Sequence, residues 1–416
     1  MNAIEDLVLV GMSQRTAPVA VRERYAVSED DARAMLEQLT SGGLVSEGVI
    51  LSTCNRTEIL ASTGDGAQGL TALRGALFRN AEPAHVYGFR GIEAIMHLFR
   101  VASGLDSLVL GETEILGQLK RSFDAGTTGR LLKPLYEQAI AVGKRVRRET
   151  SIGEGSLSVA RVGLEVAARA IGRFDDRRAV VVGAGETGLL AARHLLAAGI
   201  GDLRLLNRTP ERAAEAAEQL GERVRSLGLD QLASQFTSSD LAVVCVDGAE
   251  PLVRADELDR RALAKRDQPL VVLDLSVPRA VAEDVSGLEG VIVYDLDALL
   301  PVVEEHRAGR AAAAEEVTPI LIGEVHKFLS LRTFAAFTPA IEELKSGFAE
   351  EREALLDRIT AGQATARELE LAHAMERQLL HLALSQLKES ARQTQSTAAL
   401  ERAYLRFVEG LPGEAT

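Results

Sequence analysis

The segment from Gly183 to Gly188, which reads Gly-Ala-Gly-Glu-Thr-Gly, constrains the fold more than any other part of the chain. It follows the apolar run 178–182 and precedes an expected helix at 189–198 and a second apolar run at 203–206. This order of strand, GxGxxG, helix and strand is the setting in which the motif binds dinucleotides. Its glycines permit a tight turn and let backbone N–H groups approach a pyrophosphate at the helix N-terminus. The sequence therefore predicts a Rossmann-type domain.

The residues after the second of these strands distinguish between the two nicotinamide dinucleotides. An NAD site usually places Asp or Glu there, where the carboxylate accepts a hydrogen bond from the ribose 2′-hydroxyl. Here the sequence reads Asn207-Arg208-Thr209, without a carboxylate. The planar guanidinium of Arg208 suits a 2′-phosphate, because it can donate two parallel hydrogen bonds to phosphate oxygens. We therefore expect NADP(H).

Short apolar runs alternate with helical patterns in the first 90 residues, in the order β-α-β-β-α-β. The expected strands are 7–11, 48–51, 58–62 and 85–89, and the expected helices are 28–39 and 69–78. This order matches a ferredoxin-like split unit. Helical patterns then continue to about residue 148, and a segment rich in Gly and Ser at 151–156 predicts a domain boundary.

From about residue 296 onward the strand signals vanish and helical patterns take over. A long helix is expected at 297–331, followed by helices at 341–359, 366–389 and 397–408. Their apolar stripes must be buried against each other or against a second subunit, so we interpret this region as a dimerisation module. The expected fold is a multidomain α/β protein. It has a ferredoxin-like α+β catalytic domain (1–155), a Rossmann-type NADPH domain (156–296) and an all-α dimerisation domain on a long spinal helix (297–416).

Composition and charge exclude several classes of protein. Two cysteines argue against a disulfide framework and fit a reducing cytoplasm, and no Cys/His cluster has zinc spacing, so no metal is expected. No apolar run approaches the roughly 20 residues that span a bilayer, and the N-terminus does not read as a secretory signal. The net charge of −13 disfavours general nucleic-acid affinity. The basic cluster 144–148 is a candidate for contact with a phosphate backbone, although cations suit any helix C-terminus.

Cys54 lies where the apolar run 48–51 stops in small and polar residues. A thiol at a strand end can face a cleft, and the nearby guanidinium of Arg56 would favour the thiolate, which attacks carbonyls. On the residue alone, a buried structural cysteine is the more frequent case. His97 lies on an apolar helical stripe, where a core histidine is likewise more frequent. Cys245 lies inside an apolar run, so we expect it to pack in the core.

Several longer blocks resemble the glutamyl-tRNA reductase family, in the same order and over essentially the whole chain. They are residues 52–58, 97–112, 115–118, 143–146, 183–187, 207–209 and 274–279. The resemblance implies NADPH-dependent reduction of glutamyl-tRNA(Glu) to glutamate-1-semialdehyde, the first step of the C5 route of tetrapyrrole biosynthesis. It also implies a V-shaped homodimer in the cytoplasm, with glutamate-1-semialdehyde aminomutase as a partner that collects the aldehyde.

The resemblance assigns roles to individual positions. Cys54 would be the catalytic nucleophile, and His97 a residue important for activity. The substrate would be bound by Thr53, Asn55, Arg56, Ser107, Glu112, Thr113, Glu114 and Gln118. NADPH would be bound by Gly183, Ala184, Gly185, Glu186, Thr187 and Gly188, to which the strand-end pattern adds Asn207, Arg208 and Thr209.

The sequence departs from the family pattern in two places. Ser13-Gln14 stands where the family usually has Asn-His, and Thr113-Glu114 stands where it often has Pro-Gln. An added carboxylate at Glu114 would repel the glutamyl side chain but could favour the α-ammonium group.

These residue types fit a covalent route. An ester is a poor hydride acceptor because its oxygen donates electrons to the carbonyl, whereas a thioester donates less. Cys54 would attack the glutamyl carbonyl and expel the ribose hydroxyl, and NADPH would then reduce the thioester. Arg56 would pair with the substrate carboxylate or support the thiolate, and His97 would donate a proton to the leaving group or hydrogen-bond to it. Because Cys54 and Gly183 lie on different domains, we expect the NADPH domain to swing about a hinge near residues 153–155.

Two other functions share some of these features. A small-molecule NADP-dependent semialdehyde dehydrogenase would also use a cysteine and a dinucleotide, but it does not account for the basic cluster or the long helical tail. A non-catalytic NADPH-binding regulator would keep the fold, but the intact thiol segment and His97 speak against it.

Overall fold

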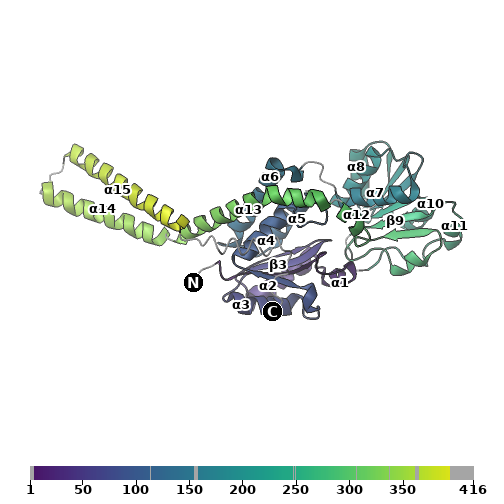
Figure 1. The fold of residues 1–416 in the computed structure, drawn as a ribbon, viewed down its shortest axis with the longest axis horizontal. Helices are drawn as coiled ribbons and strands as arrows, with labels where there is room; N and C mark the ends of the chain where they lie inside the picture. The colour runs from purple at the N-terminus through teal and green to yellow at the C-terminus, as the bar shows by residue number, and fades with distance from the viewer. Residues whose placement is uncertain are drawn as a thin grey trace. The chain divides into compact units, whose positions relative to one another are not determined.

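The computed structural model describes residues 4–112, 114–153, 158–246, 248, 250–305, 307–336, 338–360 and 365–393. The chain divides into two compact units, whose described parts adjoin between Thr318 and Pro319. The larger unit contains both β-sheets of the described chain, and the described part of the smaller unit is helical (Figure 1).

The first sheet has four strands in the order β2-β3-β1-β4, and each neighbouring pair is antiparallel. The strands are β1 (Leu7–Ser13), β2 (Glu47–Ser52), β3 (Arg56–Ser62) and β4 (Tyr87–Arg90). Helix α2 (Glu29–Ser41) lies between β1 and β2 in the chain, and α3 (Gly66–Leu77) lies between β3 and β4. The element order is therefore the β-α-β-β-α-β order predicted from the sequence. A short helix, α1 (Val19–Arg22), and a 3₁₀ turn, η1 (Glu23–Tyr25), precede α2.

Helices cover both faces of this sheet. Val8, Val10 and Met12 of β1 pack with residues of α2 and α3 in one core cluster. The other face carries α4 (Ile92–Ser103), α5 (Glu114–Ala125) and α6 (Leu132–Glu149) (Figure 1). Because side chains alternate across a strand, β1 is buried on both faces along its whole length.

The second sheet has six strands, and all of its neighbouring pairs are parallel. The strands are β5 (Arg178–Val182), β6 (Asp202–Asn207), β7 (Val224–Gly228), β8 (Leu241–Val244), β9 (Leu270–Asp274) and β10 (Val291–Tyr294). Their order, β10-β9-β8-β5-β6-β7, is the strand order of doubly wound dinucleotide-binding folds. This topology confirms the predicted Rossmann-type fold.

The helices of this second fold pack on the two faces of the parallel sheet. Residues of α7 (Val159–Ile171), α8 (Glu186–Ala197) and α9 (Pro210–Leu220) share a core cluster with Ala179 and Val181. On the opposite face, Val180 and Val182 pack with residues of α10 and α11, and further residues of the segment 253–285. The bounds of these two helices are Leu232–Ser238 for α10 and Arg260–Ala264 for α11. A strand covered on both faces reads as a continuous apolar run, and β5 does so.

The remaining described residues are helical. They form α12 (Leu300–Glu305), α13 (Arg307–Ala336), α14 (Thr338–Thr360) and α15 (Ala366–Gln393). The long helix expected at 297–331 therefore corresponds to α12 and α13, and α13 ends five residues later than expected. The helix expected at 397–408 lies outside the described residues. Large apolar side chains are exposed on α14 and α15, namely Leu355, Leu369, Leu371, Met375, Leu379 and Leu382.

Two absences hold for the part of the chain that the structure describes. None of its helices combines the length and apolar character needed to cross a membrane. Nor do its His, Cys, Asp and Glu side chains gather anywhere in a group of three or more that could hold a metal ion.

Candidate active site

Cys54 occupies the loop between β2 and β3, which are adjacent antiparallel strands. Thr53 closes this loop, because its amide donates a hydrogen bond to the Arg56 carbonyl at 2.8 Å. Its hydroxyl oxygen also accepts from the amides of Asn55 at 3.2 Å and Arg56 at 3.3 Å. The loop is thus held by its own backbone and by Thr53, and it presents the thiol beyond the end of the strand.

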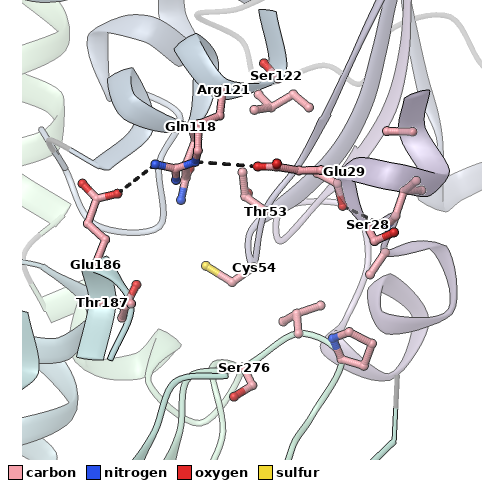
Figure 2. Close-up of a pocket in the computed structure, with 18 of the residues that line it drawn as sticks. Ser28, Glu29, Thr53, Cys54, Gln118, Arg121, Ser122, Glu186, Thr187 and Ser276 are labelled. Carbon is pink, nitrogen blue, oxygen red and sulfur yellow. Dashed lines mark hydrogen bonds and ion pairs between the residues drawn. The ribbon is translucent and has the colours of Figure 1, made fainter. Parts of the chain in front are cut away.

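Cys54 lines a pocket of about 570 Å³ (Figure 2). The wall on the side of the first sheet includes Thr53, Glu114 and Gln118, and the wall on the side of the second sheet includes Gly185, Glu186, Thr187 and Ser276. In Figure 2 the Cys54 side chain points into the space between these two walls. The structure therefore brings the predicted nucleophile and residues 185–187 of the predicted dinucleotide fingerprint to one cavity. The expected hinge at 153–155 lies largely outside the described residues.

The Cys54 thiol is half-buried, and its pKa is raised to about 12. Burial is the largest cause, and the negative charges of Glu112 and Glu114 act in the same direction, whereas the Arg22 guanidinium opposes them. A thiol with such a pKa is protonated at neutral pH and is a weak nucleophile. Its attack on a carbonyl therefore needs a nearby group that takes its proton.

Two predicted substrate residues, Glu112 and Glu114, are neighbouring carboxyl groups whose charges both act on the Cys54 thiol, and each residue is 6% exposed. Burial raises the pKa of Glu112 to about 8, and the negative charge of Glu114 is the next cause. Burial also raises the pKa of Glu114, with Glu186 adding to the effect. The Thr187 hydroxyl donates to Glu114 Oε2 at 3.3 Å. The pair thus carries a proton at neutral pH. Thr113, between them, lies outside the described residues.

His97 and Arg56 meet at the buried carboxylate of Glu58 and are not part of the described pocket wall. Glu58 Oε1 lies 3.0 Å from Arg56 Nη1, 2.8 Å from His97 Nε2 and 2.5 Å from Tyr87 Oη. Burial alone would raise the pKa of Glu58, but the positive charges of His97 and Arg56 lower it to about 2. The His97 ring also stacks on Phe89, with 4.9 Å between ring centroids. Arg56 and His97 therefore both interact with the Glu58 carboxylate, outside the described pocket wall.

The loop 104–112 is fastened to Arg56 through Asp106. Arg56 Nη2 donates to the Asp106 carbonyl oxygen at 2.6 Å, and Arg100 donates to both carboxylate oxygens of Asp106 at 2.8 and 3.0 Å. Ser107, predicted to bind substrate, follows Asp106 and is 2% exposed, away from the described pocket wall. Arg56, Asp106 and Ser107 therefore lie in a buried layer that supports the pocket.

The basic cluster 144–148 does not act as one surface. Arg147 turns inward, donating to the carbonyl oxygens of Ala102 at 2.9 Å and Glu112 at 2.5 Å. Lys144 and Arg148 are exposed. One member of the cluster thus holds the loop that carries Glu112, and the exposed members remain candidates for contact with phosphates.

Two glycines of the fingerprint allow close packing of the backbone, and a third leaves the backbone open to the pocket. Gly183 has a φ of +107°, and a Cβ there would lie 2.0 Å from the Cys245 carbonyl oxygen, so glycine is required. At Gly188 a Cβ would lie 2.0 Å from the Gly183 carbonyl oxygen. At Gly185, which lines the pocket, a Cβ would meet no heavy atom within 4 Å. A pyrophosphate can therefore approach the backbone at Gly185, the N-cap of α8, and the residues present fit a dinucleotide.

The segment that follows β6 completes this side of the site. Asn207 Oδ1 accepts from the Ala184 amide at 3.3 Å, and Asn207 Nδ2 donates to the Thr209 carbonyl oxygen at 3.0 Å. Asn207 therefore braces the glycine-rich loop. Arg208 and Thr209 are exposed beyond the carboxyl end of the strand.

Three parts of this site are not among the site residues predicted from the sequence. Arg22 donates a hydrogen bond to the Cys54 carbonyl oxygen. Cys245, predicted to be core packing, packs against the core but is half-buried and also lines the pocket. The segment Ser276–Pro278 lines the same cavity. The last two follow β8 and β9, and the carboxyl ends of parallel strands near the switch point form the cofactor crevice. This rule could have predicted Cys245 and Ser276–Pro278 as pocket residues from the sequence. No comparable sequence pattern points to Arg22.

Comparisons with known proteins bear on both halves of the site. Residues 10–150 match the family model of the glutamyl-tRNAGlu reductase N-terminal domain, and residues 165–302 match that of shikimate / quinate 5-dehydrogenase. A glutamyl-tRNA reductase of Pelotomaculum thermopropionicum is 34% identical over 98% of this chain and 95% of its own length. One of Rubrobacter xylanophilus is 37% identical, covering 92% of each chain. The solved glutamyl-tRNA reductase from Methanopyrus kandleri is 29% identical over 97% of this chain and 98% of its own, with a TM-score of 0.46.

Proposed function

The chain belongs to the glutamyl-tRNA reductase family, and we propose that it reduces the glutamyl group of glutamyl-tRNA to glutamate-1-semialdehyde with Cys54 as the nucleophile. The observation that supports this assignment most is the shared pocket. Cys54, Glu114 and Thr187 line one cavity, with the thiol on one side and the dinucleotide fingerprint on the other.

The first step is the exchange of an ester for a thioester on Cys54. Sγ attacks the glutamyl carbonyl carbon, the bond from that carbon to the ribose oxygen breaks, and the ribose leaves as a hydroxyl. The thiol proton must therefore travel to the ribose oxygen. The Glu112–Glu114 pair, which holds a proton at neutral pH beside Cys54, is suited to this transfer.

The second step is reduction of the thioester. A nicotinamide dinucleotide, when bound, supplies the reducing equivalents. Gly183, Ala184, Gly185, Glu186, Thr187 and Gly188 would hold its pyrophosphate at the N-terminus of α8. We assign the cofactor as NADPH, because Arg208 is exposed beyond β6 and its guanidinium suits a 2′-phosphate, with Asn207 and Thr209 on either side.

The substrate residues fall into two groups. Thr53, Glu114 and Gln118 line the pocket and would contact the glutamyl group. Asn55, Arg56, His97 and Ser107 are buried behind it, so we assign them to holding the thiol loop and the loop 104–112 in place. Glu112 is also buried outside the described pocket wall, and we assign it to the proton transfer, because its charge state responds to Glu114 and affects Cys54.

The proposal extends to the domains, the oligomeric state, the location and the partner of the protein. The split order of the first sheet supports a ferredoxin-like catalytic domain at 1–155, followed by an NADPH domain at 156–296 and a helical domain at 297–416. The exposed apolar residues of α14 and α15 support a homodimer. Two free cysteines fit the cytoplasm, and a labile aldehyde product favours a complex with glutamate-1-semialdehyde aminomutase.

The test is NADPH oxidation by the full chain with glutamyl-tRNA, glutamyl phosphate or free glutamate. Wild type should oxidise NADPH only with glutamyl-tRNA, and Cys54→Ser should lose this activity. Turnover with glutamyl phosphate but not with charged tRNA would instead identify a small-molecule semialdehyde dehydrogenase.

A further inference from the structure

Arg22, at the end of α1, is a buried cation that contacts the thiol loop. The residue is 2% exposed. Its Nε donates to the Ala17 carbonyl oxygen at 3.1 Å, and its Nη1 donates to the carbonyl oxygen of Cys54. A buried guanidinium with fixed donors has little freedom to move, so its charge stays at one place relative to the thiol.

Asp297 is the anion that pairs with this cation. Arg22 Nη2 lies 3.2 Å from Asp297 Oδ1, and Asp297 Oδ2 accepts from the Val19 amide at 2.7 Å. A buried charge requires a partner, and Asp297 provides it while fixing the start of α1. Asp297 comes from the segment between β10 and α12, so the thiol loop is connected through Arg22 to the region that follows the Rossmann-type fold.

Charged side chains act on the Cys54 thiol, and the guanidinium of Arg22 is one of them. Glu112 and Glu114 disfavour the thiolate, whereas Arg22 favours it. Arg56 lies two residues after Cys54 in the sequence. Its guanidinium donates hydrogen bonds to the Glu58 carboxylate and to the Asp106 carbonyl oxygen. The sequence neighbour of the thiol thus has other partners, and a residue 32 positions earlier contacts its loop.

We infer that Arg22, held by Asp297, is the positioning residue that stabilises the thiolate of Cys54 and fixes its backbone for attack. The inference rests on the proposed role of Cys54 as nucleophile. It assigns to Arg22 the support of the thiolate that the sequence suggests for Arg56.

The test measures the thiol itself and needs neither tRNA nor dinucleotide. Iodoacetamide alkylation of Cys54 in the full chain is followed by peptide mass spectrometry between pH 7 and pH 10, which separates Cys54 from Cys245. Because an opposite charge lowers a pKa by about 1 unit or more, Arg22→Met should slow alkylation at fixed pH about tenfold. Arg22→Lys, which keeps the charge, should stay within about twofold to threefold of wild type.

A matched control separates charge from tethering. Arg279 donates to both carboxylate oxygens of Glu23, at 2.8 and 3.0 Å, and so fastens the residue next to Arg22 without contacting Cys54. Arg279→Met should therefore leave the alkylation rate unchanged. An equal slowing in Arg279→Met and Arg22→Met would overturn the inference, as would an unchanged rate in Arg22→Met.

A second variant covers the case in which Arg22→Met does not fold. Asp297→Asn removes the anion that holds the Arg22 guanidinium in place, so Cys54 should be alkylated more slowly than in wild type. A faster or unchanged rate in folded Asp297→Asn, checked by circular dichroism, would contradict the inference. Because no turnover is measured, these outcomes stand apart from the test of the proposed function.

Discussion

The Thr187 hydroxyl donates a hydrogen bond of 3.3 Å to Glu114 Oε2, and this bond joins the first turn of α8 to the wall of the thiol pocket. Thr187 belongs to the dinucleotide fingerprint, and Glu114 belongs to the predicted substrate pocket. The Glu114 carboxylate in turn raises the pKa of both Glu112 and Cys54. A charge at this one position therefore affects the proton carrier and the nucleophile together.

Replacing Glu114 by Gln should make Cys54 more acidic. The substitution removes a negative charge that raises the pKa of both Cys54 and Glu112. The pKa of Cys54 should therefore fall below about 12, and that of Glu112 below about 8. Alkylation of Cys54 at pH 8 should become several-fold faster. The control is Glu29→Gln, which changes a carboxylate that lines the same pocket and lies 4.0 Å from the Arg121 guanidinium. Equal effects of the two substitutions would contradict this account.

Replacing Glu58 by Gln should destabilise the first domain by about 3 kcal/mol at pH 7, because Arg56 and His97 would lose their buried anion. The pKa of Glu58 is lowered from 4.5 to about 2. A lowered carboxyl pKa stabilises the folded state above the unfolded value and loses this effect as pH falls through the folded one. The difference between wild type and Glu58→Gln should therefore shrink between pH 4.5 and pH 2. Hydrogen exchange of the β3 amides in both proteins at several pH values measures this difference in stability.

The matched control for Glu58 is an exposed ion pair in the same domain. Asp30 lies 3.4 Å from Arg33 and its side chain is 96% exposed. Solvent screening leaves such pairs little net effect, so Asp30→Asn should change the stability by less than about 0.5 kcal/mol. A Glu58→Gln protein as stable as Asp30→Asn would show that the buried network contributes nothing.

Replacing Arg208 by Leu should weaken NADPH binding selectively. A charge-assisted hydrogen bond to phosphate contributes roughly 1.5–3 kcal/mol, which corresponds to about a tenfold to hundredfold rise in KM for NADPH. NADH lacks the 2′-phosphate, so its KM should not change. Arg212→Leu, at an exposed arginine of the neighbouring helix α9, should leave both values near wild type. A parallel rise for NADH and NADPH would exclude the 2′-phosphate contact.

The sequence predicts the backbone of this protein better than the directions of its side chains. The fingerprint, the parallel strands and the order of the first sheet follow from apolar periodicity and glycine spacing, which are local signals. The partners of Arg56 and His97 are not local, because Glu58 gathers both from different elements of the fold. Arg22 donates a hydrogen bond to the Cys54 carbonyl oxygen, although the two residues are 32 positions apart in the sequence. Adjacency in sequence suggests Arg56 as a partner of the thiol, whereas we infer that role for Arg22.

The most direct test of the account is a search for the acyl-enzyme. The full chain is mixed with glutamyl-tRNA in the absence of any dinucleotide, quenched in acid and digested, and its peptides are analysed by mass spectrometry. The account predicts a glutamyl group on the peptide that contains Cys54, which disappears when NADPH is added before the quench and never forms in Cys54→Ser. A glutamyl group on another residue, or NADPH oxidation by Cys54→Ser at the wild-type rate, would contradict it.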